Sequence, residues 1–262
     1  MSFEDPRLKI YHPTYHRKKN SGSLRAARTV LPILLDRFEV RSVVDFGCGA
    51  GTWLAAAKEL GVSDLTGIEG PWAETWVDDS ILSRADFSLV LQSLEEPVRL
   101  ARRFDLAVSL ETAEHLTASR AQSFVEELCA ASTRILFAAA IPGQGGNNHF
   151  NEQWPSYWAS IFARSRYVPV DCIRSRIWDV ADIPWWYRQN CILYVQENEL
   201  ARIESEPNGP LPRSSGPLDV IHPDLFAGKS PAARVKSLVK MARHPVTLVR
   251  ALRADRNPEV AI

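Results

Sequence analysis

Three glycines at alternate positions, Gly47, Gly49 and Gly51, constrain the fold of this chain more than any other feature. They follow the apolar run S-V-V-D-F at residues 42–46, and a helix-compatible stretch begins at Trp53. Glycine tolerates positive φ and lets a ligand lie against bare backbone, while the start of a helix offers unpaired N–H groups. The pattern predicts a strand, a tight turn and a helix at the carboxyl end of a parallel strand, where α/β proteins bind nucleotide-type ligands.

The spacing of the glycines distinguishes between cofactors. A dinucleotide fingerprint, G-x-G-x-x-G, would need a glycine where this chain has Thr52, which argues against an NAD-dependent oxidoreductase. The pattern found is G-x-G-x-G, with Asp45 two residues before it. This resembles the first motif of the class I S-adenosylmethionine (SAM) methyltransferases, in which the turn carries the amino-acid part of SAM.

The resemblance implies which residues hold SAM. The acid that ends the second strand of that family maps onto Glu69, whose carboxylate can accept hydrogen bonds from both ribose hydroxyls. An Asp usually follows the third strand and accepts from the adenine amino group, but this chain has Ser93 there, followed by Leu94. The expected cofactor-binding residues are Asp45, Gly47, Cys48, Gly49, Gly51, Glu69, Ser93 and Leu94.

Length and composition favour one large domain with a tail. The 262 residues are 45% hydrophobic, which is enough for a substantial core, and 31 basic residues balance 31 acidic ones. The zero net charge gives no general attraction to nucleic acid, so no nucleic-acid partner is expected. The four cysteines have no regular spacing, and the N-terminus has no apolar segment typical of a signal peptide. A cytoplasmic location is therefore expected.

The order of predicted elements matches the α/β fold that this family shares: a Rossmann-like, doubly wound, seven-stranded and mostly parallel sheet with helices on both faces. We expect an N-terminal arm over residues 1–24, the methyltransferase domain over 25–196, a linker over 197–217, and a basic amphipathic helical tail over 218–262. The seven predicted strands cover residues 42–46, 65–69, 87–92, 104–110, 134–141, 167–173 and 189–195. Predicted helices cover residues 24–38 (kinked at Pro32 or beginning near Thr29), 52–60, 72–76, 98–103, 117–132 (capped by Thr117 or Ser119), 154–163 and 231–244.

The C-terminal tail has two interpretations. Lys236, Lys240 and Arg243 recur at helical spacing, and Val235, Leu238, Val239 and Ala242 share the other side of the expected helix. Such a helix packs on its own domain or on a partner, or it contacts a membrane surface through residues 231–253.

Candidate catalytic residues follow the fourth and fifth strands, where class I methyltransferases bring the acceptor to the cofactor. Glu111, Glu114 and His115 form an E-x-x-E-H group, and His149 follows the glycine-rich loop P-G-Q-G-G-N-N. The loop continues as H-F-N-E-Q-W-P, and the whole stretch resembles one found in bacterial methyltransferases that modify glycans or natural products. His149 is the leading general base, with His115 and Glu111 beside the acceptor.

Two questions stay open at this point. A similar E-x-x-E-H group with a later histidine binds a divalent metal in the small-RNA 2′-O-methyltransferases, so Glu111, Glu114, His115 and His149 could do the same, although no metal is part of the expected site. The expected function is SAM-dependent O-methylation of a hydroxyl on a glycan or small-molecule acceptor. The alternatives are an NAD-dependent oxidoreductase and a non-catalytic SAM-binding scaffold.

Overall fold

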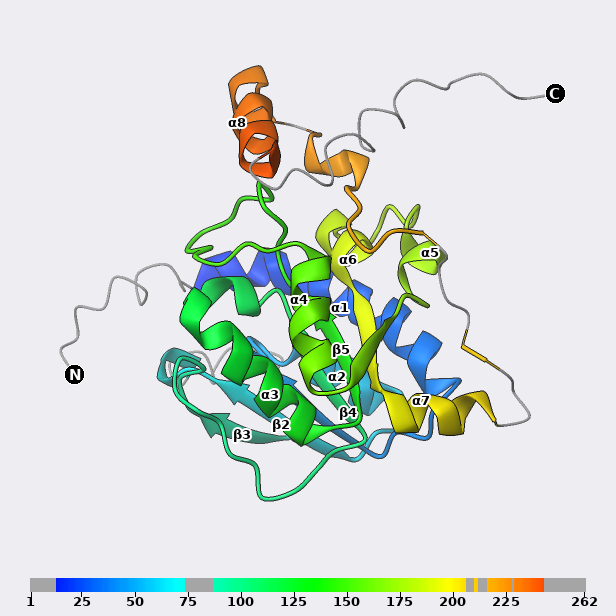
Figure 1. Cartoon of the computed structure of the whole chain (residues 1–262). Coiled ribbons are helices and arrows are strands. Elements are labelled where there is room, and N and C mark those ends of the chain that lie inside the picture. Colours follow the sequence, from blue (N-terminus) through cyan, green and yellow to red (C-terminus); the bar gives the residue numbers. More distant parts are fainter. Residues whose placement is uncertain (1–12, 74–86, 206–209, 212–215, 228, 243–262) are drawn as a thin grey trace.

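The computed structural model of the chain describes residues 13–73, 87–205, 210–211, 216–227 and 229–242. It contains one seven-stranded sheet in the order β3-β2-β1-β4-β5-β7-β6, which confirms the predicted fold class (Figure 1). The strands are β1 (Ser42–Phe46), β2 (Asp64–Glu69), β3 (Ser88–Leu91), β4 (Leu106–Leu110), β5 (Arg134–Ala138), β6 (Tyr167–Val170) and β7 (Ile192–Gln196). The first five strands pair in parallel, and β7 lies antiparallel between β5 and β6.

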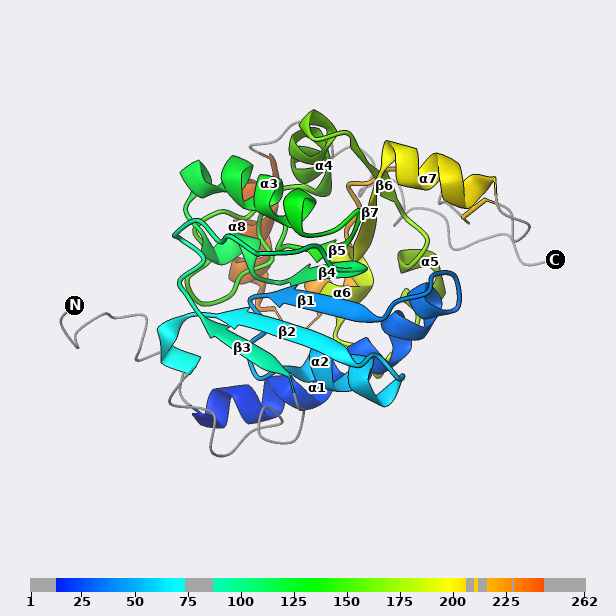
Figure 2. The ribbon, with the colours of Figure 1, turned by 90° about the horizontal axis from the view of Figure 1, so that it is seen from below.

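Helices cover both faces of this sheet. Figure 2 shows α1 and α2 on one side of the strands and α3 and α4 on the other. The described α-helices are α1 (Pro13–Leu35), α2 (Thr52–Glu59), α3 (Ala121–Ala131), α4 (Pro155–Arg164), α5 (Arg174–Ile177), α6 (Trp185–Asn190), α7 (Glu197–Glu204) and α8 (Pro231–Ala242). Short 3-10 helices lie at Ala113–His115, Ala118–Arg120 and Pro223–Leu225. None of these helices is both long and apolar enough to cross a bilayer.

Alternate strand residues supply two separate cores. Val43 of β1 packs with α1 and α2, whereas Val44 and Phe46 pack with α3 and α4. All five residues of β1 and of β4 are buried, as expected for central parallel strands covered on both faces. Because the first five strands run in parallel, the loops after β1, β4 and β5 meet at one edge of the sheet.

The N-terminal helix differs from the prediction. Helix α1 begins at Pro13, so residues 13–23 are helical rather than irregular, and the helix continues through Pro32 instead of beginning near Thr29. A proline inside a helix costs about 3 kcal/mol. Here Ala27, Leu31 and Leu34 are buried in the core beside α2, and that burial offsets the cost. The first twelve residues of the expected arm lie outside the described part of the chain.

Three further local predictions were wrong. Residues 98–103 form no helix, since Val98 is buried in the core and the segment is too short to nucleate a helix alone. The Thr117 hydroxyl hydrogen bonds to Glu95 rather than capping a helix, and α3 begins without a side-chain cap. Residues 197–204 form α7 rather than a linker, because Leu200 and Ile203 are buried and Glu199 pairs with Arg134.

The C-terminal segment packs on the domain. His222 and Leu225 are buried, so residues 218–226 of the expected tail dock on the domain before α8 begins. Helix α8 buries Ser237 and Met241, whereas Val235, Leu238 and Val239 are exposed. The predicted apolar face is therefore not the face that packs.

Candidate functional site

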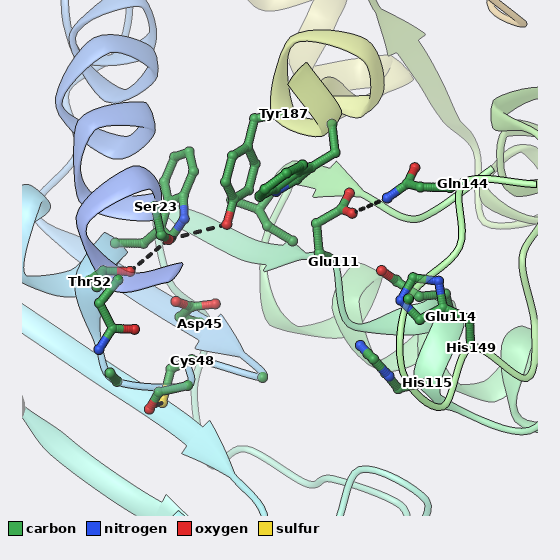
Figure 3. Close-up of a pocket in the computed structure, with 18 of the residues that line it drawn as sticks. Ser23, Asp45, Cys48, Thr52, Glu111, Glu114, His115, Gln144, His149 and Tyr187 are labelled. Atoms are coloured by element: carbon green, nitrogen blue, oxygen red, sulfur yellow. Dashed lines mark hydrogen bonds between the residues drawn. The ribbon is translucent and has the colours of Figure 1, made fainter. Parts of the chain in front are cut away.

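A cavity of about 320 Å³ opens at the carboxyl edge of β1 and β4 (Figure 3). Helix α1, the glycine turn, the segment after β4, the glycine-rich loop after β5 and helix α6 all line it. Its described lining residues are Asn20, Ser23, Asp45, Gly47, Cys48, Gly49, Ala50, Thr52, Trp53, Leu110, Glu111, Glu114, His115, Gln144, Gly145, Gly146, His149, Trp185, Trp186 and Tyr187. The cavity therefore brings the start of the predicted cofactor motif and all three predicted catalytic residues together.

The glycine turn needs glycine for two different reasons. Gly47, Gly49 and Gly51 all have positive φ, at 83°, 53° and 70°. A Cβ on Gly47 would lie 2.4 Å from the Thr112 hydroxyl oxygen, so the turn can approach the segment after β4 only without a side chain. A Cβ on Gly49 would meet no atom within 4 Å, so this residue presents bare backbone to the cavity. Gly51 caps α2 and does not line the cavity.

Asp45 is a buried acid at the wall of the cavity. Its side chain is almost inaccessible, and burial raises its pKa well above the usual range, with the nearby charge of Glu69 adding to the effect. Ionised Asp45 is therefore destabilised in the protein alone and would be stabilised by a cationic ligand in the cavity. Its position fits the role that the sequence predicts.

The Glu69 carboxylate, which was expected to bind the ribose of SAM, accepts hydrogen bonds from the protein itself. Its carboxylate accepts from the backbone N–H of Gly49 at 2.8 Å, from that of Gly70 at 2.9 Å, and from the indole N–H of Trp72 at 3.0 Å. Burial raises the pKa of Glu69, and these hydrogen bonds oppose that rise. Glu69 does not line the cavity, so a ribose would have to share the carboxylate with Trp72 or replace it.

The predicted adenine contacts also lie outside the cavity. The Ser93 hydroxyl accepts from the backbone N–H of Glu95 at 3.3 Å, and the carbonyl of buried Leu94 accepts from Arg120 at 2.9 Å. Both residues follow β3, at the same edge of the sheet as Glu69. Residues 74–86, which connect β2 to β3, are not described.

Glu111 is held in a strained conformation at the end of β4. Its φ of 55° is unusual for a residue with a side chain, and its backbone N–H donates to the Ala138 carbonyl at 2.8 Å. The side-chain amides of Gln144 and Asn190 donate to its two carboxylate oxygens at 2.6 and 2.8 Å. Backbone strain of this kind occurs where the surrounding structure fixes it, often at active sites.

His115 and His149 contact each other at one side of the cavity (Figure 3). Their rings are 4.9 Å apart between centroids and almost perpendicular. Together with the buried Glu114 they offer three ligand atoms within 4.8 Å of one another. Three of the four residues weighed as metal ligands thus meet, but Glu111 is outside this group. Two imidazoles and one carboxylate suit a first-row transition ion better than magnesium, which prefers oxygen.

The sequence analysis missed the hydrogen bonds that join three helices beside the cavity. The Ser23 hydroxyl lies 2.8 Å from that of Thr52 and accepts from the Tyr187 hydroxyl at 3.1 Å, so α1, α2 and α6 meet there. Burial raises the pKa of Tyr187, which keeps its hydroxyl protonated as a donor. Asn20 and Ser23 lie almost one turn apart on α1, inside the segment expected to be irregular. A helical period extended before Leu24 is the signal that could have found them.

Comparisons with known proteins agree with this architecture. A family model described as a methyltransferase domain matches residues 16–132. An O-methyltransferase family protein from Burkholderia thailandensis has a TM-score of 0.52 and 11% identity, over 74% of this chain and 60% of that one. The methyltransferase solved with the Trm112 activator of Haloferax volcanii has a TM-score of 0.50 and 17% identity, over 74% and 99% of the two chains. No curated protein matches the sequence.

The magnesium protoporphyrin IX methyltransferase of Synechocystis PCC 6803, solved with bound SAH, has a TM-score of 0.47 and 13% identity, over 75% and 89% of the two chains. At these identities the two structures with TM-scores of 0.52 and 0.50 bear on the fold alone, whereas the family model bears on the sequence of residues 16–132. Residues 16–132 therefore match a methyltransferase domain, and the seven-stranded sheet has the Rossmann-like fold of SAM-dependent methyltransferases.

Proposed function

We propose that this methyltransferase transfers the methyl group of SAM to a hydroxyl of a glycan or small-molecule acceptor. The observation that carries the proposal is the single cavity with the glycine turn on one wall and Glu111, His115 and His149 on another. An in-line displacement needs the methyl donor and the nucleophile held in this way, and an oxygen nucleophile usually needs a base nearby.

The electrostatics of the cavity favour SAM, which carries a sulfonium and an ammonium. Its described lining includes Asp45, Glu111 and Glu114 and no lysine or arginine. The amino-acid part of SAM would lie along Gly47 and Gly49, with Cys48 and Asp45 beside it. The Glu69 carboxylate would accept hydrogen bonds from the ribose hydroxyls in place of the one that it accepts from the Trp72 indole. The same acidic lining disfavours a phosphate or carboxylate acceptor.

His149 is the proposed general base. Its Nδ1 lies 3.2 Å from the Glu152 carboxylate, so Nε2 can accept the proton of an acceptor hydroxyl. Gln144 and Glu111 can hydrogen bond to neighbouring hydroxyls, and the rings of Trp185 and Trp186 offer apolar faces to a sugar or an aromatic ring. His115 lies against His149, on the same side of the acceptor.

Calorimetry with SAM tests the cofactor site. Wild-type protein should bind SAM with micromolar affinity, and Asp45→Ala and Gly49→Arg should abolish binding. Gly61→Arg is the matched control, because Gly61 also has positive φ, at 94°, but lies after α2, outside the cavity. Binding that survives both site changes would contradict the placement.

A screen with methyl-labelled SAM tests the reaction. Glycans, phenols and a cell extract are offered as acceptors, and labelled products are identified by mass. Turnover on a hydroxyl compound supports the proposal, whereas SAM binding without any product favours the scaffold. Quenching of nicotinamide fluorescence on titration with NADH would instead favour the oxidoreductase.

A metal-assisted form of the same reaction is the second candidate. The observation that favours it is the cluster of Glu114, His115 and His149. An ion there would polarise the acceptor oxygen directly. Activity lost on dialysis against a chelator and restored by manganese or zinc, but not by magnesium, supports this form. Activity unchanged by the chelator leaves His149 as a base.

The exposed face of α8 supports a proposed contact with a membrane surface. Val235, Leu238 and Val239 are 58%, 39% and 53% exposed, and residues 229–254 include no acid. Vesicles rich in phosphatidylglycerol should sediment the protein, and vesicles of phosphatidylcholine should not. Val235→Glu should weaken the association, whereas Leu60→Glu, at an exposed leucine on another element, should not.

A further inference from the structure

Glu152 is a buried acid beside the proposed base, His149. It lies between the glycine-rich loop and α4, and its side chain is 2% exposed. Its carboxylate accepts from the backbone N–H of Gly143 at 2.9 Å and from that of Gly145 at 3.0 Å. It also contacts Nδ1 of His149 at 3.2 Å and accepts from the Lys240 ammonium. One carboxylate thus holds two glycines of the loop, the candidate base and a residue of the C-terminal helix.

Helix α8 is fixed on the same loop by independent contacts. The Ser237 hydroxyl donates to the Gly143 carbonyl at 3.0 Å, and the Lys229 ammonium donates to that carbonyl at 2.9 Å. A Cβ on Gly143 would lie 2.9 Å from the Ser237 backbone oxygen, so the approach is as close as glycine permits. Met241 is buried against Trp154 and its neighbours. Figure 1 shows the loop reaching from the sheet to α8.

The charge of Glu152 decides which nitrogen of His149 carries the proton. The Glu152 carboxylate accepts from two backbone N–H groups, those of Gly143 and Gly145, and from the Lys240 ammonium, and these donors favour its ionised form. An ionised carboxylate only accepts hydrogen bonds, so His149 must donate through Nδ1. A neutral imidazole then has Nε2 as its acceptor, on the side of the ring away from Glu152.

We propose that Glu152 is a positioning residue that orients the His149 ring with a proton on Nδ1, and that Lys240 keeps Glu152 in place. The C-terminal helix is thereby part of the active site, although it lies outside the segment that matches the family model. Nε2 is left free for the proton of the acceptor, or for a metal ion that polarises the acceptor. The catalytic part of this inference rests on the proposed function, whereas the tautomer does not.

Two-bond proton–nitrogen correlation spectra test the tautomer without an acceptor. The full chain is labelled with nitrogen-15 histidine, and spectra are recorded above neutral pH with SAM present. His149→Gln assigns the signal among the six histidines. Wild-type His149 should show the Nδ1–H pattern, which free histidine does not favour. The Nε2–H pattern in the wild type would overturn the proposal, and no variant has to fold for that outcome to be seen.

Matched variants of α8 test the link to Lys240. Lys240→Met should convert the His149 pattern to Nε2–H or to a mixture of tautomers, and Lys240→Arg should restore the wild-type pattern. Lys236→Met, an exposed lysine on the same helix, should change nothing. Identical His149 spectra for Lys240→Met and Lys236→Met would overturn the role of Lys240.

Kinetics separates this proposal from the proposed function. With any acceptor found in the screen, Glu152→Ala should lower kcat about 10- to 100-fold. The KM for SAM and the calorimetric affinity for SAM should stay within about twofold, because Glu152 does not line the cavity. An unchanged kcat would overturn the positioning role. If no acceptor is ever methylated, the proposed function fails while the spectra still decide the tautomer.

Discussion

Alanine at three glycines should separate the stability of the glycine turn from its ligand contact. Gly47, Gly49 and Gly61 all have positive φ, so Ala costs each about 1–2 kcal/mol of backbone strain. Only at Gly47 does the new Cβ meet a neighbour, at 2.4 Å from the Thr112 oxygen, and overpacking adds about 1–3 kcal/mol. We therefore expect losses of about 1–2 kcal/mol for Gly49→Ala and Gly61→Ala and about 2–5 kcal/mol for Gly47→Ala.

Urea unfolding measures the stability of each variant, and calorimetry measures its affinity for SAM. Gly49→Ala should have the same free energy of unfolding as Gly61→Ala. It should bind SAM at least about tenfold more weakly, a loss of about 1.4 kcal/mol, because its methyl group enters the cavity. Gly61→Ala should keep full affinity. Equal unfolding energies for Gly47→Ala and Gly61→Ala would refute the steric reasoning. Full affinity in Gly49→Ala would refute the position of the cofactor.

The other predictions concern charge and packing. Asp45→Asn should stabilise the ligand-free protein at neutral pH and abolish SAM binding. Burial raises the pKa of Asp45, so the wild type loses stability as the pH rises above the pKa that Asp45 has in the unfolded state, whereas the variant does not. Hydrogen bonds from Arg202 and Arg134 lower the pKa of Glu199 despite its burial. Ionised Glu199 therefore contributes stability above the pKa that it has in the unfolded state, and this contribution is lost as the pH falls through the acid range. Glu199→Gln should remove this pH dependence from the free energy of unfolding measured in urea. Met241→Ala should cost about 2–5 kcal/mol of local stability and speed hydrogen exchange of α8 and the glycine-rich loop, whereas Val239→Ala should leave both unchanged.

The sheet could be predicted from the sequence because its signals are local. Strand β1 lies at residues 42–46 as predicted, and β2 differs by one residue, since apolar runs beside glycine turns define both. The meeting of the glycine turn with His115 and His149 followed from one rule, that parallel strands end at the same edge. Chain order alone therefore placed most of the cavity.

The errors arose where tertiary contacts override local preference. Pro32 predicted an interruption that the packing of α1 on α2 overrides. Helix α8 carries an apolar stripe, but the glycine-rich loop needs hydrogen-bond donors, so Ser237 and Lys240 face the protein and Val239 does not. The hydrogen bond from Trp72 to Glu69 could not be predicted either, because a sequence does not show which donor a buried carboxylate will accept from.

The hydrogen bond between Tyr187 and Ser23 joins residues 164 positions apart. A chain still emerging from the ribosome completes its glycine turn early, but the wall that Tyr187 and the two tryptophans before it provide arrives only after most of the protein has been made. SAM consequently has no closed pocket to enter during early synthesis, and it can stabilise only chains whose last described sheet strand, β7, is about to form. SAM binding therefore follows the folding of the domain and does not direct it.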